Sequence, residues 1–201
     1  MAKTRGELTR EHILAKAAPL FNQRGYAGAA MSDVMAATGL EKGGIYRHFE
    51  SKDALALAAF DYAARVHGRR LLAATEAAHT APDRLSALVT TFATIADDPP
   101  IPGGCPLLNM AVESDDTHPA LRDAARGAMD GLRALVVRIV DDGVRAGELA
   151  PDADGDEIAS LSISTLEGAL MLSRLYDDPT HMHRAVRHLL ALIRALAVPA
   201  R

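Results

Sequence analysis

The stretch TGLEKGGIYRHFESKDAL, residues 38–55, gathers side chains suited to binding a polyanion. Lysine supplies a point charge, and tyrosine and histidine can donate hydrogen bonds to phosphate oxygens. Two adjacent glycines carry no side chains, so the backbone there can approach another molecule closely. Taken alone, a Tyr-x-His-Phe cluster is more often a packing corner than a contact with another molecule. The candidate contact residues in and near this stretch are Ser32, Lys42, Gly43, Gly44, Tyr46, His48 and Lys52.

Two short predicted helices position these residues. The first starts near Ser32, whose hydroxyl can accept from the free amides of the first turn, and Gly39 ends it. The second covers roughly residues 42–49. This order is the helix-turn-helix arrangement, in which the second helix lies in the major groove of DNA. Ile45 and Phe49 are four residues apart and are expected to point inward, away from the DNA.

Longer helices are predicted on both sides of this pair. The preceding helix is expected to start at Thr9 as N-cap, to bend at Pro19 and to end at Gly25. The following helix is capped by Ser51 and runs without a Pro-Gly-Ser linker into the rest of the chain. Movement in one part of the molecule can therefore be transmitted mechanically to the other.

Charge and cysteine content limit the function classes. Lys and Arg number 22 against 26 Asp and Glu, for a net charge of −4 over 201 residues. No global positive field attracts DNA or a membrane, so any such binding must be local, and the first quarter of the chain is its net basic part. The single Cys105 excludes an intrachain disulfide and a multi-thiolate metal site within one chain. Without an apolar signal-like or membrane-spanning run, the expected localisation is cytoplasmic.

The remaining sequence predicts an all-α fold. Almost every segment between Gly or Pro residues carries a helical period, and none shows sustained alternation of apolar and polar residues. Further helices are expected to open near Cys105 and to cover roughly residues 119–146, the latter closed by Gly147. We predict a helix-turn-helix DNA-binding domain over residues 1–50. A long helix joins it to an effector-binding and dimerisation domain over residues 51–201.

The run ILAKAAPLFNQRGYAGAAMSDVMAATGLEKGGIYRHFESKDAL, residues 13–55, resembles the N-terminal DNA-binding domain of the tetracycline-repressor (TetR) family of bacterial transcriptional regulators. The shared pattern has Phe before Arg-Gly-Tyr, an Ala-Ala-x-Gly turn, and Gly-x-Ile-Tyr-x-His-Phe-x-x-Lys. Two departures are Pro19 inside the first helix and Gly44, where many relatives carry a side chain able to touch a base. Lys42 is then the main candidate for base readout.

The resemblance implies a homodimer of about nine helices that binds an operator in double-stranded DNA. It also implies that a small effector binds the C-terminal domain and loosens the DNA complex, most often as release of a repressor. In such a protein Lys42, Gly43 and Gly44 would lie nearest the bases. The residues at the DNA backbone would be Ser32, Tyr46, His48 and Lys52.

Two further surfaces are predicted in the C-terminal part. Small-molecule sites combine adaptable apolar surface with a few polar atoms, and the expected effector-lining residues are Tyr62, Phe92, Cys105, Asn109, Met110 and Met171. The last two helices carry more apolar residues than one chain's core is expected to use, which favours a dimer interface. The residues expected there are Leu161, Leu166, Ala169, Leu170, Leu172, Val186, Leu189, Ile193 and Leu196.

Alternative functions rest on isolated groups. Cys105 at a helix start could be a reactive sensor thiol or the nucleophile of a helical-bundle enzyme, or a small buried hydrophobe. Asn109 could read ligand polarity or be a satisfied core amide. His181, His183 and His188 could suggest a metal site, but side chains two apart on a helix diverge, and a solvated helix start fits them better. Asp115, Asp116 and His118 could suggest acid-base chemistry, but no nucleophile or phosphate-binding glycine loop accompanies them, and they fit capping of the next helix better. We expect no enzyme activity, cofactor or metal.

Overall fold

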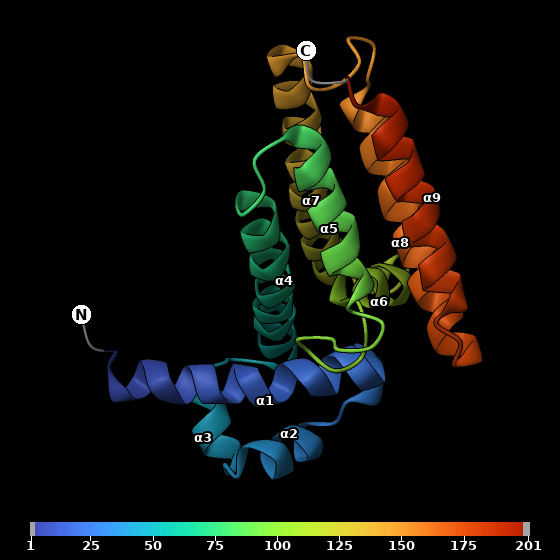
Figure 1. Ribbon diagram of the computed structural model, residues 1–201. Helices are drawn as coiled ribbons and strands as arrows, with labels where there is room; N and C mark the ends of the chain where they lie inside the picture. Colours follow the sequence, from blue (N-terminus) through green and yellow to red (C-terminus); the bar gives the residue numbers. More distant parts are fainter. Residues whose placement is uncertain (1–2, 199–201) are drawn as a thin grey trace. The chain divides into compact units, whose positions relative to one another are not determined.

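The computed structural model describes residues 3–198, and within this range the chain forms nine α-helices (Figure 1). The extended contacts within the same range amount to one isolated antiparallel bridge between Leu149 and Ala197. The all-α prediction is therefore confirmed. The helices are α1 Arg5–Gly28, α2 Met31–Thr38, α3 Lys42–Tyr46, α4 Lys52–Glu76, α5 Ala81–Ala93, α6 Pro106–Ser114, α7 Pro119–Ala146, α8 Gly155–Tyr176 and α9 Thr180–Leu196.

The chain divides into two compact units. The first contains the residues up to Val66 together with Ile101–Ala128, and the second contains His67–Pro100 together with the residues from Met129 onward. Helix α4 passes from the first unit into the second without interruption. The predicted boundary at residue 50 separates two functions, whereas the division described here follows packing contacts. The functional boundary therefore stays a prediction.

Capping residues explain where helix α1 begins and breaks. Its N-cap is Thr4, whose hydroxyl accepts from the amide of Glu7 while the Glu7 carboxylate accepts from the amide of Thr4. The predicted cap at Thr9 is wrong: its hydroxyl donates to the carbonyl of Arg5 inside the helix. Gly25, with φ of 74° and ψ of 170°, is the non-helical position inside α1, and one further helical turn follows it. Glycine accommodates this positive φ without the cost that a β-carbon brings.

The other helix boundaries follow the predicted signals closely. Gly39 stops α2 in the left-handed conformation, with φ of 69°, and the hydroxyl of Ser51 accepts from the amide of Ala54 in the first turn of α4. Helix α6 begins directly after Cys105, and Gly147 follows the end of α7. Among the described residues, no helix combines the length and apolar character needed to cross a membrane.

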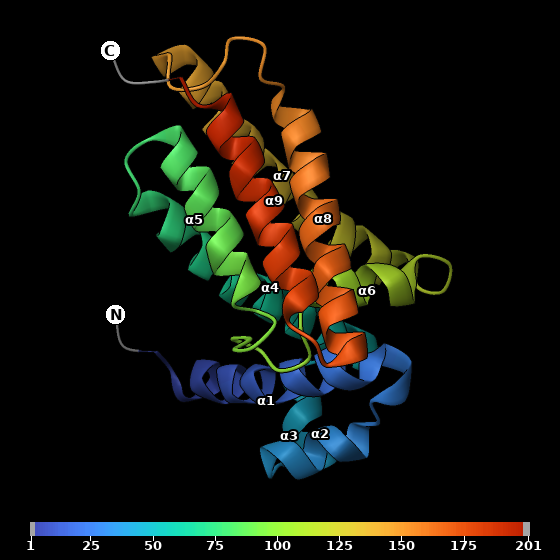
Figure 2. The same ribbon diagram turned by 45° about the vertical axis from the view of Figure 1, so that its right-hand side comes forward.

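In the second unit, helices α5, α8 and α9 pack together and lie side by side in two views (Figures 1 and 2). Their shared core contains Leu85, Leu166, Leu170, Leu189 and Ile193. Glycine allows two close approaches, of which the first leaves no room for a β-carbon and the second is tight. A β-carbon on Gly143 would lie 2.4 Å from that of Ala81, and one on Gly155 would lie 3.1 Å from the α-carbon of Val137.

This core corrects part of the predicted interface. Leu166, Ala169, Leu170, Leu189 and Ile193 are buried within one chain, so they are core residues of the monomer. Helical periodicity identifies apolar positions but does not say whether the same chain or a partner covers them. The large apolar side chains that α8 does leave exposed are Leu161, Met171, Leu175 and Tyr176.

Candidate nucleic-acid interface

Helices α2 and α3 form a compact helix-turn-helix held against α1 in the first unit (Figure 1). Val34 and Ile45 are fully buried, and Phe49 is almost so. The inward direction predicted for Ile45 and Phe49 is confirmed. Nε2 of His12 on α1 lies 3.0 Å from the carbonyl oxygen of Thr38, at the end of α2. Because a carbonyl can only accept, this nitrogen donates, and it fixes the start of the turn to α1.

The opposite side of α3 is open. Lys42 and Gly43 are exposed, while Gly44, Tyr46 and His48 are partly exposed. The ammonium of Lys42 lies 5.7 Å from the centre of the Tyr46 ring, so the two side chains share one face of the helix. The structure thus brings five of the predicted contact residues together on this short helix and the residue pair that follows it.

Nothing within the described chain explains the glycine pair at 43 and 44. Both lie outside the positive-φ region, so neither backbone conformation requires glycine. A β-carbon on Gly43 would meet no atom within 4 Å, and one on Gly44 would make an ordinary contact, 3.5 Å from the β-carbon of Leu40. Glycine is an unfavourable helix residue. The pair therefore costs stability in the free protein and leaves a surface onto which another molecule can pack closely.

Ser32 and Lys52 lie outside α3 and have different surroundings. Ser32 is exposed in the first turn of α2 and does not cap it: the Asp33 carboxylate accepts from the amide of Ala30 instead. This amide, and then Arg24 at 2.8 Å, lower the pKa of Asp33. The ammonium of Lys52 stands 4.4 Å from the centre of the Tyr26 ring.

The Tyr26 ring belongs to a polar cluster at the start of α4. The hydroxyl of Tyr26 donates to the carboxylate of Asp53, and Nε2 of His118 lies 3.3 Å from the other oxygen of that carboxylate. The hydrogen bond to Asp53 raises the pKa of Tyr26 to about 12, and the bonds from Tyr26 and His118 lower the pKa of Asp53. The cluster fixes the beginning of α4 against the end of α1.

Two exposed arginines near α3 were not predicted as site residues. Arg47 directly follows α3, and the guanidinium of Arg10 on α1 lies 4.9 Å from the centre of the Phe49 ring. Arg47 stands inside the quoted stretch and its charge was a usable signal. The proximity of Arg10 to α3 depends on tertiary packing and had no signal in the sequence.

The predicted effector residues fall into both units. In the first, Asn109 and Met110 line a cavity of about 20 Å³ between α1, α4 and α6, and Tyr62 and Cys105 are not among its lining residues. This volume holds about one water molecule. The amide nitrogen of Asn109 donates to the backbone oxygens of Asn22 and Gly103, which matches the alternative of a satisfied amide.

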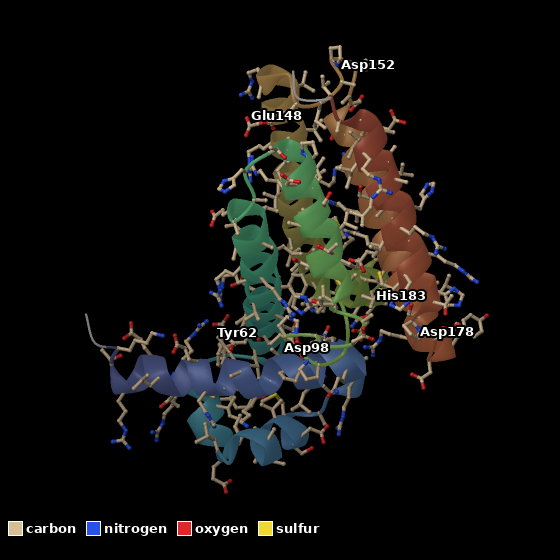
Figure 3. The ribbon with its side chains drawn as sticks, in the orientation of Figure 1. Tyr62, Asp98, Glu148, Asp152, Asp178 and His183 are labelled. Carbon is tan, nitrogen blue, oxygen red and sulfur yellow. The ribbon has the colours of Figure 1, made fainter. Side chains whose placement is uncertain are left out.

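The other predicted effector residues have contrasting environments. Cys105 is buried, with 4% of its surface exposed, and Tyr62 on α4 is half-buried (Figure 3). In the second unit, Phe92 is buried in α5, whereas Met171 is 52% exposed on α8. No finding tests their role as effector contacts, which stays a prediction.

His67 is a buried polar residue that the sequence did not single out. It lies on α4 with 4% of its surface exposed, and neither ring nitrogen has a hydrogen-bond partner among the described residues. Burial, and then the charge of Arg70, lower the pKa of His67 to about 4. A histidine between Val66 and Gly68, in a segment that also carries three arginines, gives no sign in the sequence that folding buries it.

The alternative sites are also placed. Within residues 3–198 no group of His, Cys, Asp and Glu side chains is arranged to hold a metal ion. The ring of His181 stacks on Tyr176, and His183 is exposed on α9 (Figure 3). Nδ1 of His118 accepts from the amide of Leu121, which confirms that His118 caps α7.

Comparison with known proteins agrees with this geometry. Residues 13–59 match the family model for bacterial regulatory proteins of the tetR family, and residues 81–189 match the model for the tetracyclin repressor-like C-terminal domain. A TetR transcriptional regulator from Chloroflexus aurantiacus J-10-FL is 47% identical, with a TM-score of 0.93 over 98% of this chain and 99% of that one.

Two curated sequences extend the comparison. An uncharacterized HTH-type transcriptional regulator of Mycobacterium tuberculosis is 31% identical over 191 residues, which cover 90% of this chain and 93% of the relative. The HTH-type transcriptional repressor DhaR of Mycobacterium sp. strain GP1 is 27% identical over 167 residues, covering 83% of this chain and 82% of the relative.

Proposed function

The chain belongs to the tetR family of bacterial transcriptional regulators, and from this premise we propose that it is a ligand-responsive repressor that binds a palindromic operator as a homodimer. The observation that carries the DNA-contacting role of α3 is the glycine pair at 43 and 44, which the fold does not need. A backbone free of side chains can approach base edges, while Lys42, Tyr46 and Lys52 supply charge and donors for the DNA. The relative DhaR is a transcriptional repressor.

A footprinting titration tests this proposal. The parent protein is titrated against duplex DNA from the region upstream of its own gene, with a random duplex of equal length as control. We expect protection of an inverted repeat whose half-site centres are about one helical turn, roughly 34–36 Å, apart. Equal affinity for both duplexes would contradict operator recognition.

The proposed dimer uses the exposed face of α8. Leu161, Met171 and Leu175 lie on one side of this helix, opposite the buried Leu166 and Leu170. Gly168 lies between them, and a β-carbon there would meet no atom within 4 Å, so a partner helix can approach closely. Two such faces related by a two-fold axis make an isologous interface.

The proposed effector is a small molecule that binds reversibly and favours a conformation with weaker operator affinity. The cavity next to Asn109 and Met110 is too small for it in the described conformation, because ligand sites have volumes of about 300–1,000 Å³. Binding in this cavity therefore requires opening, and only a ligand that prefers the opened state can shift the balance. A displacement screen on the operator complex tests this step, and a ligand that stabilises the protein without releasing DNA would contradict it.

Replacement of Gly43 by alanine is expected to have opposite effects on folding and on DNA binding. Folding should be stabilised by about 0.5–1 kcal/mol, because alanine is the better helix former and its β-carbon has free space. Operator binding should weaken because the methyl group enters the contact surface. Urea denaturation and fluorescence anisotropy measure the two effects. Gly68→Ala, also in open space but on α4, is the control that should leave operator affinity unchanged.

Lys42→Ala and Lys52→Ala are expected to differ in kind. Lys42→Ala should relax sequence preference, at a cost of about 1–3 kcal/mol for one base pair per half-site, because it removes base readout. Lys52→Ala should weaken binding to all duplexes by a similar factor and reduce the salt dependence of the affinity, because it removes a phosphate contact. Affinities for the operator and for single-base variants at two salt concentrations separate these outcomes. Equal effects of both substitutions on specific and random duplexes would contradict the division of roles.

Cys105 offers a direct comparison between a reversible ligand and a thiol sensor. Because the thiol is 4% exposed, we expect an electrophile such as N-ethylmaleimide to leave the operator complex intact over minutes, for both the parent and Cys105→Ser. Rapid release of DNA from the parent alone would instead support the sensor alternative. Anisotropy after reagent addition, with mass spectrometry of the modified thiol, provides the measurement.

A further inference from the structure

A carboxylate from α6 closes the break in α1. Oε2 of Glu113 accepts from the amide of Tyr26 at 2.8 Å, and Oε1 accepts from the amide of Ala27 at 3.0 Å. All three residues belong to the first unit. A β-carbon on Gly25 would lie 2.6 Å from Oε1, so glycine is needed here both for its φ of 74° and for the space that the carboxylate occupies.

The break creates the need for this carboxylate. After the non-helical Gly25, residues 26–28 form a new helical turn, whose first amides have no carbonyl one turn earlier in the helix. Such amides are ordinarily satisfied by a side chain at the N-cap, but the residue at that place is glycine. Glu113 supplies the missing acceptor from a helix 87 positions away in the chain. Both oxygens are used, so a neutral amide at residue 113 can satisfy only one of the two donors.

Two neighbouring contacts tie the same helices together. Nδ2 of Asn22 donates to the backbone oxygens of Pro102 and Gly104, in the loop before α6, at 3.0 and 3.2 Å. Nδ2 of Asn109 donates to the backbone oxygen of Asn22 at 3.1 Å. Asn22, Asn109 and Glu113 all line the small cavity described above. A displacement of α6 would therefore reach the end of α1 through side chains that already touch.

The end of α1 leads directly into the DNA-contacting helices. One residue, Ala29, separates the end of α1 from Ala30, the N-cap of α2. The carboxylate of Asp33 accepts from the amide of Ala30, and Asp33 in turn pairs with Arg24 on α1. The direction in which the chain leaves the Glu113 contact thus sets where α2 begins. Helix α2 carries α3 by way of the turn at Gly39.

We propose that Glu113 is a positioning residue for DNA recognition: by capping residues 26 and 27 it holds α2 and α3 in the pose that reads an operator. The inference rests on the proposed operator-binding function and adds a residue outside the helix-turn-helix to it. Glu113 touches no DNA in this scheme. Its loss changes the discrimination between sequences, whereas the phosphate contacts that support non-specific binding persist.

The test compares Glu113→Gln with the parent and with Glu76→Gln, an exposed glutamate at the end of α4. Loss of one charge-assisted bond corresponds to about a tenfold loss of operator affinity in Glu113→Gln, with less than about a twofold change for a random duplex. Glu76→Gln should match the parent on both. Partial unfolding would weaken binding to both duplexes by the same factor. The ratio of the two affinities therefore still distinguishes a change in recognition from a loss of folded protein.

Amide hydrogen exchange supplies a readout that does not depend on DNA. In Glu113→Gln, exchange at Tyr26 or Ala27 should accelerate by at least about tenfold, while the amides of Ile45 and Leu55 keep their parental rates. Equal affinity of the parent for the operator and for random DNA would contradict the proposed function. The exchange measurement would still show whether Glu113 caps residues 26 and 27. An unchanged affinity ratio in a parent that does recognise an operator, or unchanged exchange at both amides, would overturn the role of Glu113.

Discussion

Replacement of Met171 and Leu175 by glutamate is expected to give a folded monomer that binds a palindromic operator at least about 100-fold more weakly than the parent, because two linked half-site contacts are lost together. Both side chains are more than half exposed in the single chain, so the substitutions should change the stability of the monomer by no more than about 0.5 kcal/mol. In the dimer they would place four negative charges in an apolar contact, where unpaired charge is strongly unfavourable.

Sedimentation velocity and anisotropy measure the two consequences. Thr90→Glu with Thr94→Glu, at exposed positions at the end of α5, is the matched control and should remain dimeric. A single half-site should bind the α8 variant and the parent protomer with similar affinity. A variant that still sediments as a dimer would place the interface on another face of the second unit. Leu189→Glu with Ile193→Glu cannot serve this purpose, because both positions are core and the variant should unfold.

The contrast between these two pairs shows what the sequence could and could not predict about α8 and α9. An apolar residue every three or four positions predicted both helices. Both helices carry apolar residues on more than one face, and the sequence holds no information on which face its own chain covers. That assignment needed the packing of α5 against both helices, which brings together residues about a hundred positions apart.

Helix ends were predictable where the signal is local. Gly39, Ser51 and Gly147 act within one turn of the residues that they stop or cap, and each lies where its type predicts. The predicted cap at Thr9 was wrong because Thr4 offers the same hydroxyl group earlier in the chain. Thr4 is also followed three residues later by Glu7, which completes the capping box. Where two residues can each cap a helix, its start depends on whether the additional turn between them is stable, and the local sequence pattern does not give that stability.

The candidate DNA surface was predictable for a similar reason. Its residues lie within one short stretch, in which the apolar pair Ile45 and Phe49 indicates the buried side and the polar Lys42 an exposed position. Glu113 and His118 were not predictable as partners of α1 and α4. Their contacts join positions 65 to 87 residues apart, and neither residue type nor local pattern encodes such a distance. The same holds for His67, whose burial depends on how its helix packs.

The buried ring of His67 is expected to have the second large effect, on how the free energy of unfolding depends on pH. The pKa of its ring is about 4 in the folded protein against an ordinary value of 6.5, so the unfolded chain takes up a proton at a higher pH than the folded one. The stability contributed by the neutral ring is complete above pH 6.5 and is lost as the pH falls toward 4. Between pH 7.5 and pH 5 this linkage should lower the free energy of unfolding by about 2 kcal/mol.

His67→Leu isolates that contribution. Leucine cannot take up a proton, so the variant should lose the part of the pH dependence that His67 causes, measured by urea denaturation at fixed protein concentration. At pH 7.5 it should also be more stable than the parent by about 1–2 kcal/mol, because a buried imidazole with two unsatisfied nitrogens is replaced by an apolar side chain of similar size. His79→Leu, at an exposed position between α4 and α5, should retain the parental slope. Identical slopes in the parent and His67→Leu would mean that the His67 ring is hydrated or paired in solution, and that its burial in α4 does not control acid stability.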